Sequence, residues 1–370
     1  MVVRGRLVLE DRVAAGRLHL ADGRIAAIEL DEAEAGGPYV APGYVDVHVH
    51  GWGGHDAMGT RDDLDGMARA LLRRGVTSFL PTAVTASLEA IRGFADRVRD
   101  WIPSAPTDGA SPLGFNLEGP FISPARRGAQ NAAFIIAPSD VSLATLAPLL
   151  PGLRITTVAP ETPGALDLIR WLTQNWVVVS LGHSVATLHE GRAGYAAGAR
   201  TTTHLFNAMT GVDHRAPGLA VAALTDDAAC VELVADGHHV HRGLWPIIVR
   251  TKPAGRLILV SDAMYLAGTG DGRGTLGGLA VEVSEGRARL AGTTTLAGSV
   301  TALDMEVRNL VAEGFPLPAA VAAASRNPLA LIGVTDRGRI EVGQRADLVE
   351  LDEDLGVVRV ARAGEWRIPA

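Results

Sequence analysis

The chain has 370 residues, of which 47% are hydrophobic and 20% are charged, and its formal net charge is −7. This composition predicts a well-packed core, in one large domain of roughly 250–300 residues with a smaller one beside it. The acidic balance without a basic block argues against a nucleic-acid partner. No apolar run reaches the ~18 residues of a membrane span, so no membrane association is expected.

The N-terminal segment and the cysteine content bear on location. Charges at Arg4, Arg6 and Glu10 interrupt the first residues, and such a segment is unlike a secretory signal. Cys230 is the single cysteine, so no internal disulfide can form. This usage is typical of a reducing compartment, and we expect a cytoplasmic protein.

Both ends of the chain are rich in short strand patterns with turns between them, over residues 1–41, 338–352 and 357–367. Strand-rich ends around a long middle can pair with each other. We therefore expect a small β-sandwich domain built from residues 1–42 and 336–370, and a main domain over residues 43–335.

The middle of the chain alternates strand and helix patterns. Apolar strands are expected near 44–50, 77–83, 112–118, 154–159, 177–182, 200–205, 230–235 and 256–261. Helical patterns fall at 62–75, 87–102, 142–150, 165–175, 187–198 and 244–250, with two more at 301–314 and 317–332. Eight strands with intervening helices predict an α/β fold, a (β/α)8 TIM barrel. An open doubly wound sheet is the alternative, which the absence of a G-x-G-x-x-G turn after the first strand disfavours.

The first strand of the middle part ends in two histidines. Residues 41–54 read A-P-G-Y-V-D-V-H-V-H-G-W-G-G. Valines at every second position place Asp46, His48 and His50 together on the opposite face. Two imidazoles on one face can point at one cation, although two polar residues at a strand end are also common.

Later strands end in the same kind of residue. The residues that follow five different strands are Glu118, His183, His204, the group His238, His239 and His241, and Asp262. Barrel enzymes carry their chemistry at the carboxyl ends of the strands, so these ends converge on one mouth. So many polar groups together would be costly unless something pairs them. Imidazole with carboxylate favours zinc, iron, cobalt or nickel over calcium or magnesium.

This arrangement predicts metal-assisted hydrolysis. A divalent cation lowers the pKa of water from ~15.7 to about 7 and polarises a carbonyl, while a nearby carboxylate moves the proton. Asp262 is the candidate base, because it stands alone after the last strand.

With these motifs assembled, the chain resembles the amidohydrolase superfamily and, within it, the N-acetylglucosamine-6-phosphate deacetylases. The resemblance spans nearly the whole chain and includes the strand-rich ends. Its motifs, in order, are P-G-Y-V-D-V-H-V-H-G, L-E-G-P-F-I-S, L-G-H-S, T-H-L-F-N-A-M, R-A-P-G-L, A-D-G-H-H-V, L-V-S-D-A-M and T-L-A-G-S.

The resemblance implies a role for each matching residue. Asp262 would be the general base and then the acid that protonates the sugar amine. The main metal would be bound by Glu118, His183 and His204. Substrate contacts would come from Ala129, Gln130, Asn207, Ala208, Leu296, Ala297 and Gly298, and the phosphate would be held by Arg215 and His239. A guanidinium fork suits a phosphate dianion, although Arg215 could equally form a surface ion pair.

Two features depart from the family pattern. Some members lack the first-strand histidine pair and use one metal, whereas His48 and His50 are present here and allow a second. Other members of the superfamily bridge two metals with a carboxylated lysine on the fourth strand, but Lys252 is the only lysine and precedes the last strand. In G-A-Q-N, Gln130 stands where the family usually has a histidine, and glutamine cannot become cationic.

The resemblance also implies one or two divalent metals per subunit, zinc first and iron, cobalt, nickel or manganese otherwise, and a homodimer. Two alternatives stay open: a deacetylase of another N-acyl amino sugar or N-acyl amino acid, and a non-catalytic sugar-binding protein on the same scaffold. The Gly-rich segment 265–278 is the candidate lid.

Overall fold

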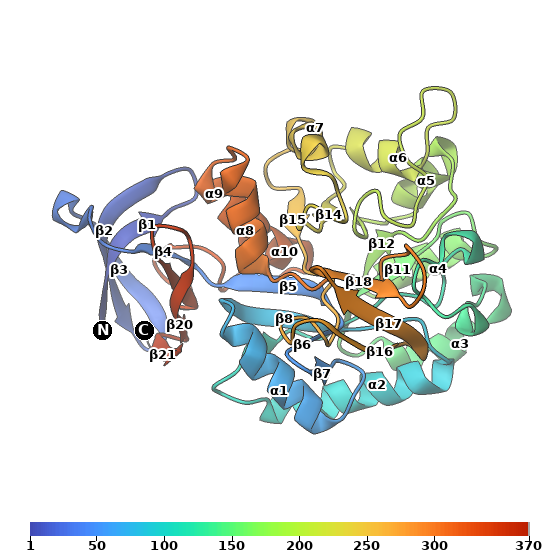
Figure 1. Cartoon of the computed structure of the whole chain (residues 1–370), viewed down its shortest axis with the longest axis horizontal. Coiled ribbons are helices and arrows are strands. Elements are labelled where there is room, and N and C mark those ends of the chain that lie inside the picture. Colours follow the sequence, from blue (N-terminus) through green and yellow to red (C-terminus); the bar gives the residue numbers. More distant parts are fainter. Residues whose placement is uncertain (369–370) are drawn as a thin grey trace.

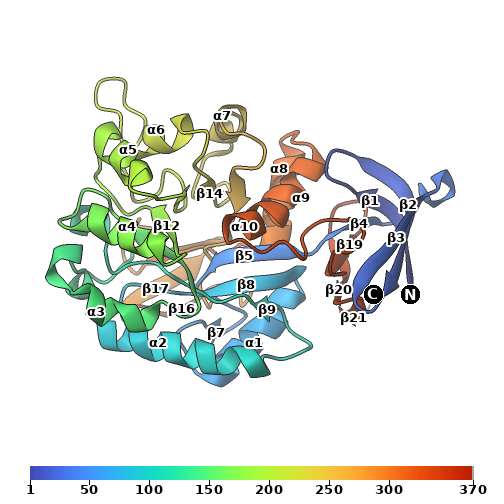
Figure 2. The ribbon, with the colours of Figure 1, turned by 180° about the vertical axis from the view of Figure 1, so that it is seen from behind.

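The computed structural model describes residues 1–368, so the last two residues of the expected range 336–370 lie outside the described part. Figure 1 shows a large α/β part and, at one end of it, a small sheet that holds both ends of the chain. The view from behind shows the same two parts (Figure 2).

Eight parallel strands form the centre of the large part, each within a few residues of its predicted position. They are β5 (Tyr44–Val49), β8 (Val76–Ala83), β10 (Phe115–Leu117), β11 (Leu153–Val158), β12 (Val178–Leu181), β13 (Thr201–Thr202), β14 (Val231–Leu233) and β15 (Leu257–Leu259). The first six pair in the order β13-β12-β11-β10-β8-β5, with β9 (Ser111–Pro112) beside β8, and β14 pairs with β15. Backbone hydrogen bonds from Cys230 N to Arg200 O, 2.8 Å, and from Asp262 N to His48 O, 2.9 Å, connect the two sets. The large part is therefore a TIM-like barrel.

The alternation along the strands separates two apolar clusters. In β5, Val45 and Val47 lie in a buried cluster with Leu80 and Ile155, whereas Tyr44 and Val49 belong to the larger cluster that includes the helices. Tyr44, Val45 and Val47 follow the alternation of a regular strand. Val49 does not, because the register of β5 against β8 shifts between Asp46 and Val49. The sequence placed Asp46 on one face with His48 and His50, whereas the histidine cluster does not include Asp46.

Ten α-helices lie in the described residues, besides short 3-10 turns: α1 (Arg61–Leu72), α2 (Leu88–Trp101), α3 (Leu143–Leu146), α4 (Ala165–Gln174), α5 (Leu188–Ala196), α6 (Leu219–Thr225), α7 (Trp245–Thr251), α8 (Leu303–Ala312), α9 (Leu317–Ala323) and α10 (Arg326–Leu331). Helix α6 has no counterpart among the sequence predictions. The single helix expected over 317–332 is two helices, because residues 324 and 325 interrupt it. None of the helices in residues 1–368 has the length and apolarity needed to cross a membrane.

Strands from both ends of the chain pair into one seven-stranded sheet of order β21-β20-β19-β4-β1-β2-β3. Its members are β1 (Val2–Val8), β2 (Val13–Ala21), β3 (Arg24–Leu30), β4 (Tyr39–Pro42), β19 (Leu348–Leu351), β20 (Val357–Arg362) and β21 (Glu365–Ile368). The sheet has its own apolar cluster, which includes Leu7, Leu18, Ile25 and Leu348. The hydrogen-bonded path is one continuous sheet, and its description as a two-layer sandwich stays a prediction.

The Gly-rich segment near the barrel mouth is largely ordered as strands. An antiparallel sheet of β16 (Gly272–Leu276), β17 (Leu279–Ser284) and β18 (Arg287–Leu290) lies in front of the barrel strands in Figure 1. A short hairpin of β6 (Gly51–Trp52) and β7 (His55–Asp56) follows β5. The expected lid loop 265–278 thus contains strand β16, and its movement stays a prediction.

Candidate active site

The residues that follow the barrel strands meet at one end of the barrel in two clusters. The four-residue cluster is His48, His50, Glu118 and Asp262, and the three-residue cluster is Glu118, His183 and His204. In each cluster, one ligand atom per residue lies within 4.8 Å of the others. Every member is buried, with at most 5% exposure. Glu118 belongs to both clusters and can bridge them, as the resemblance requires in the absence of a strand-four lysine.

The three-residue cluster is compact around one carboxylate oxygen. Oε1 of Glu118 lies 2.9 Å from Nε2 of His183 and 2.8 Å from Nε2 of His204. The two imidazole nitrogens are 3.1 Å apart.

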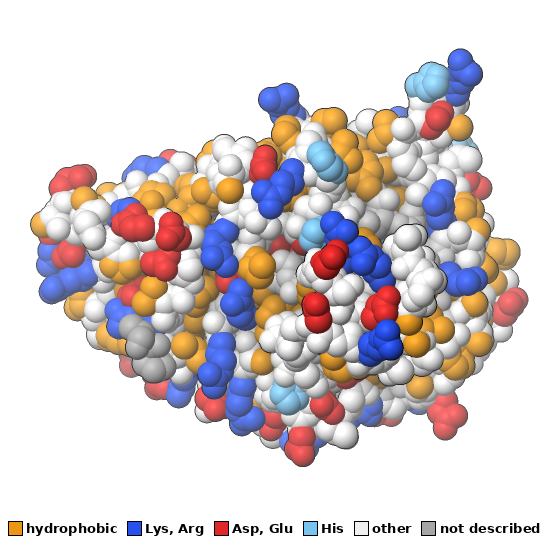
Figure 3. All heavy atoms as spheres, viewed as in Figure 1, with side chains coloured by type: hydrophobic (Ala, Val, Ile, Leu, Met, Phe, Trp, Pro, Cys, Tyr) orange, Lys and Arg blue, Asp and Glu red, His pale blue; other side chains and the backbone are white. Residues whose placement is uncertain are grey.

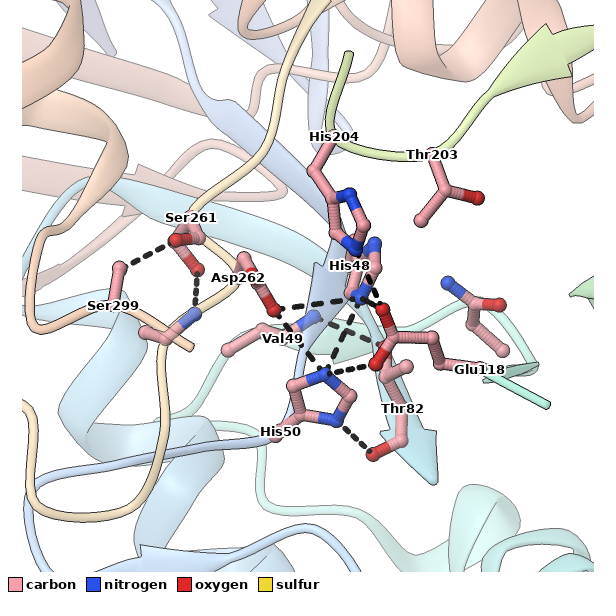
Figure 4. A network of polar contacts seen from close by, with 12 residues as sticks. His48, Val49, His50, Thr82, Glu118, Thr203, His204, Ser261, Asp262 and Ser299 are labelled. Carbon is pink, nitrogen blue, oxygen red and sulfur yellow. Dashed lines mark hydrogen bonds and ion pairs between the residues drawn. The ribbon is translucent and has the colours of Figure 1, made fainter. Parts of the chain in front are cut away.

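The four-residue cluster faces both oxygens of the same carboxylate, His48 toward Oε1 and His50 toward Oε2. Nε2 of His50 is 3.1 Å from Oε2 of Glu118 and 3.2 Å from Oδ1 of Asp262. Nε2 of His48 lies 3.3 Å from that of His50 and 3.6 Å from each carboxylate. Figure 4 shows these side chains converging from β5, β10 and the segment after β15.

In three of the four rings, a hydrogen bond at Nδ1 fixes which nitrogen faces the cluster. Nδ1 of His50 donates to the carbonyl of Thr82, 3.1 Å, and Nδ1 of His183 donates to the carbonyl of Arg126, 2.9 Å. In a neutral ring the Nε2 lone pair then faces carboxylate oxygens about 3 Å away. Two acceptors at that distance repel unless a proton or a cation lies between them. The donor set therefore fits a divalent metal centre.

The pKa of Glu118 reflects the same crowding. Burial by itself would raise the pKa of Glu118, but the charges of His48 and His183 outweigh it and hold the pKa well below its usual range. For Asp262, burial is likewise outweighed by the hydrogen bond from His50 and the charge of His48, so its pKa is lowered. These directions apply when the rings of the clusters are protonated. A divalent cation between neutral rings would supply the positive charge instead, and both carboxyls would again be ionised, as a metal ligand or a general base requires.

Three of the converging residues have a left-handed backbone, with φ values of +47° at His183, +26° at His204 and +48° at Asp262. Such conformations cost of order 1–3 kcal/mol each for residues other than glycine, and persist where the surroundings enforce them. Each residue stands just after its barrel strand, where the chain turns at the mouth.

A cavity of about 330 Å³ opens onto both clusters. Of the residues proposed for substrate binding, those that line it are Ala129, Gln130, Asn207, Ala208, His239, Leu296 and Gly298. Ala297 is fully buried and does not line it. Arg215 is not among the lining residues either, because it lies in the exposed segment 211–216. That segment belongs to the loop that protrudes beside α5 and α6 in Figure 1, and the protruding part carries acidic, basic and histidine side chains in Figure 3.

Gln130 uses both ends of its amide within the protein. Its Oε1 accepts the N–H of Thr85, 2.7 Å, and its Nε2 donates to Oε2 of Glu118. The glutamine therefore holds the carboxylate that the two clusters share. The resemblance implies a substrate contact for Gln130, and the hydrogen bonds of its amide are to Thr85 and Glu118.

Three further residues belong to the site and were not found in the sequence. Glu232 lies inside β14, and its Oε2 accepts Nδ1–H of His48, 3.1 Å. Asp236 accepts Nδ1–H of His239, 2.8 Å. Arg126 lines the cavity with an exposed side chain. Since Glu232 is one charge in an apolar strand, only the inward direction of its side chain marks it, and a single sequence does not give that direction.

The model of the amidohydrolase family matches residues 39–367. The fold, the buried histidine–carboxylate centre and this match define the class: the chain belongs to the amidohydrolase family, hydrolases that act on carbon–nitrogen bonds.

Its relatives within the family are sugar-phosphate deacetylases. The chain is 39% identical to N-acetylgalactosamine-6-phosphate deacetylase of Escherichia coli O157:H7, with 98% of each chain covered. It is 38% identical to the human N-acetylglucosamine-6-phosphate deacetylase, over all of this chain and 91% of that one. A variant of the Mycobacterium smegmatis N-acetyl-D-glucosamine-6-phosphate deacetylase, solved in complex with N-acetyl-D-glucosamine-6-phosphate, superimposes with a TM-score of 0.92 at 36% identity, covering 100% of this chain and 99% of that one. The family resemblance seen in the sequence is thereby confirmed.

Proposed function

We propose that the chain removes the acetyl group of N-acetylglucosamine 6-phosphate, releasing glucosamine 6-phosphate and acetate. The observation that carries the proposal is the pair of buried clusters that share Glu118 at the floor of one cavity. The relatives' names and the sugar-phosphate complex of a structural neighbour support the same substrate.

The residues take the following parts in this proposal. A divalent cation, with zinc as the first choice, would be held by Glu118, His183 and His204, and a second by the four-residue cluster. Such a cation lowers the pKa of water to about 7 and polarises a carbonyl. Asp262, ionised and facing the cavity, would take the proton from the attacking water and deliver it to the amine that leaves.

The phosphate contacts are part of the proposal. His239 lines the cavity, and Nε2 of this ring lies 3.8 Å from Oδ2 of Asp262. The guanidinium of Arg126 supplies a second positive side chain at the same cavity. Arg215 would act through the protruding segment 211–216, and we propose a homodimer in which that segment reaches the partner's site.

The division into domains is also a proposal. Residues 1–42 and 336–368 would be one domain, supported by the separate apolar cluster of the terminal sheet, and residues 43–335 the other. A cytoplasmic location stays a prediction, in keeping with the free thiol of Cys230.

The direct test is acetate release from N-acetylglucosamine 6-phosphate by the purified protein, before and after removal of metal with a chelator. The variant Asp262→Asn should lose several orders of magnitude in kcat, since general acid–base catalysis alone contributes about 10²–10⁴-fold. Metal analysis of the variant separates loss of the base from loss of the cation. Near-normal turnover in Asp262→Asn would remove Asp262 from this role.

A second candidate substrate is N-acetylgalactosamine 6-phosphate, which differs in the orientation of one hydroxyl group. The relative from Escherichia coli, whose name gives this substrate, favours the comparison. The ratio of kcat/KM for the two substrates decides between them, and the unphosphorylated sugar serves as the control for the phosphate contacts.

A further inference from the structure

Glu232 is a carboxylate in the barrel interior, one layer below the metal ligands. It is fully buried in β14, and its neighbours on the same face, Cys230 and Val234, belong to the interior apolar cluster. A carboxylate in such surroundings is costly unless it is paired. Its Oε1 has no hydrogen-bond partner in the described residues, so every hydrogen bond of this carboxylate is made by Oε2.

Both contacts of Oε2 go to candidate metal ligands. It accepts Nδ1–H of His48, 3.1 Å, and the backbone N–H of His204, 3.3 Å. The first contact places the lone pair of a neutral His48 on Nε2, the atom that faces His50, Glu118 and Asp262. A carboxylate behind a ligating histidine fixes its tautomer and raises its basicity.

The charge count of the centre points the same way. Two divalent cations would bring four positive charges against the carboxylates of Glu118 and Asp262. The other histidines of the two clusters donate to backbone carbonyls or, at Nδ1 of His204, have no partner in the described residues. Glu232 is thus the carboxylate behind the four-residue cluster, and its negative charge would help to balance a cation bound there.

We propose that Glu232 is the positioning residue that gives the four-residue cluster its affinity for a cation, and so makes this a two-metal centre. The inference rests on the proposed function only in requiring a divalent-metal amidohydrolase centre. The three-residue cluster keeps its ligands without Glu232, so one cation remains when the residue is changed.

The test is a titration of chelator-stripped protein with Zn²⁺, followed by calorimetry and metal analysis. The wild type should bind two Zn²⁺ per chain. Glu232→Gln keeps an acceptor near His48 but removes the charge, and its second site should weaken by about 10–100-fold while the first is unchanged. With Mn²⁺ as probe, the spin-coupled pair of the wild type should give way to an isolated ion.

The matched control is Glu306→Gln, because Glu306 is also fully buried and makes no side-chain hydrogen bond to the described residues. Burial raises the pKa of Glu306 well above its usual range, so the amide is a close mimic of the neutral acid. This variant should bind both cations like the wild type.

Equal second-site affinity in Glu232→Gln and the wild type would overturn the proposal, as would a wild type that binds one cation at saturating Zn²⁺. Should Glu232→Gln fail to fold, Glu232→Asp keeps the charge but withdraws it from His48, and unchanged second-site affinity there would count against the proposal equally. A wild type that binds two cations but releases no acetate would instead contradict the proposed substrate and leave the role of Glu232 standing.

Discussion

At the scale of single residues, the candidate site combines ionised carboxylates with histidines whose orientation is fixed from behind. Glu118 is held by Gln130, and His183 by the carbonyl of Arg126. Because these contacts come from the protein itself, they preorganise the centre, and such preorganisation is a main source of electrostatic stabilisation in active sites.

Arg126 should contribute substrate affinity through its side chain, while its carbonyl continues to orient His183. Arg126→Ala should lower kcat/KM for the phosphorylated sugar by roughly tenfold or more, as expected for loss of a charged hydrogen bond. In the same variant, kcat/KM for the unphosphorylated sugar should change little. The matched control is Arg127→Ala, since Arg127 is exposed and does not line the cavity. Equal losses for both substrates would contradict a phosphate contact.

The pair of Asp236 and His239 predicts a pH dependence. Burial by itself lowers the pKa of His239, but the hydrogen bond and the charge of Asp236 outweigh it, and the pKa is raised above 6.5. A raised pKa keeps the imidazolium to higher pH, so its attraction for phosphate is complete below 6.5 and is lost as pH rises through the raised value.

Asp236→Asn should move this loss to lower pH, because the neutral amide no longer stabilises the imidazolium. The measurement is KM against pH for the phosphorylated sugar, together with NMR titration of the His239 ring. If the dependence of KM on pH is unchanged in the variant, His239 does not bind the phosphate.

At the scale of elements, helices α5 and α6 pack closely because α5 carries glycine at the contact. A Cβ on Gly191 would lie 2.8 Å from Cβ of Ala222 in α6. Glycine in a helix costs about 0.5–1 kcal/mol relative to alanine, so its presence here has a packing reason.

Gly191→Ala should therefore destabilise the protein despite its better helix propensity, by about 1–3 kcal/mol as in other overpacked cores. Gly93→Ala in α2 is the matched control, since a Cβ there meets nothing within 4 Å, and it should stabilise by about 0.5–1 kcal/mol. Calorimetric melting compares the two variants. A Gly191→Ala variant that melts at or above the wild type would show that α6 moves away freely.

The strands of the barrel could be predicted because each is a short apolar run that ends in polar or glycine residues, as 44–50 does before Gly51. Helix α6 could not, since its sequence L-A-V-A-A-L-T has no polar stripe and no side-chain cap. Strands β16–β18 were missed although β17 alternates, with Val281 and Val283 in a buried apolar cluster. The glycines that surround this short pattern indicated a loop instead. The ligands at strand ends were visible as a group, whereas Glu232 within a strand and Asp236 in a loop become recognisable only through their partners.

At the scale of the whole molecule, the terminal sheet is joined to the barrel by apolar packing and by specific hydrogen bonds. Val349, Leu351 and Val360 of the sheet belong to the same buried apolar cluster as the barrel and its helices. Arg362 of β20 donates to the carbonyls of Pro106, Thr107 and Gly109, at 2.6–3.2 Å, in the segment that leads to β9. The two N–H groups of Nη1 are thus shared among three carbonyls of the barrel part, of which that of Pro106 also accepts the N–H of Gly109.

Arg362→Met should cost about 1–3 kcal/mol, because it leaves partly buried carbonyls without a donor. Arg24→Met removes a single exposed contact to Gly343 within the terminal region and should change stability by less than about 0.5 kcal/mol. Thermal unfolding measures both, and hydrogen exchange at residues 106–109 locates the effect. Equal stability of the two variants would mean that Arg362 is not needed to hold the sheet in place.

The protruding segment 211–216 has a consequence for limited digestion. Six consecutive exposed residues at a loop tip are the preferred kind of cleavage site, and the bond after Arg215 suits trypsin. An isolated chain should be nicked there first. If two copies associate through this segment, the nick should slow as protein concentration rises, and mass spectrometry of the earliest fragments would show the protection directly.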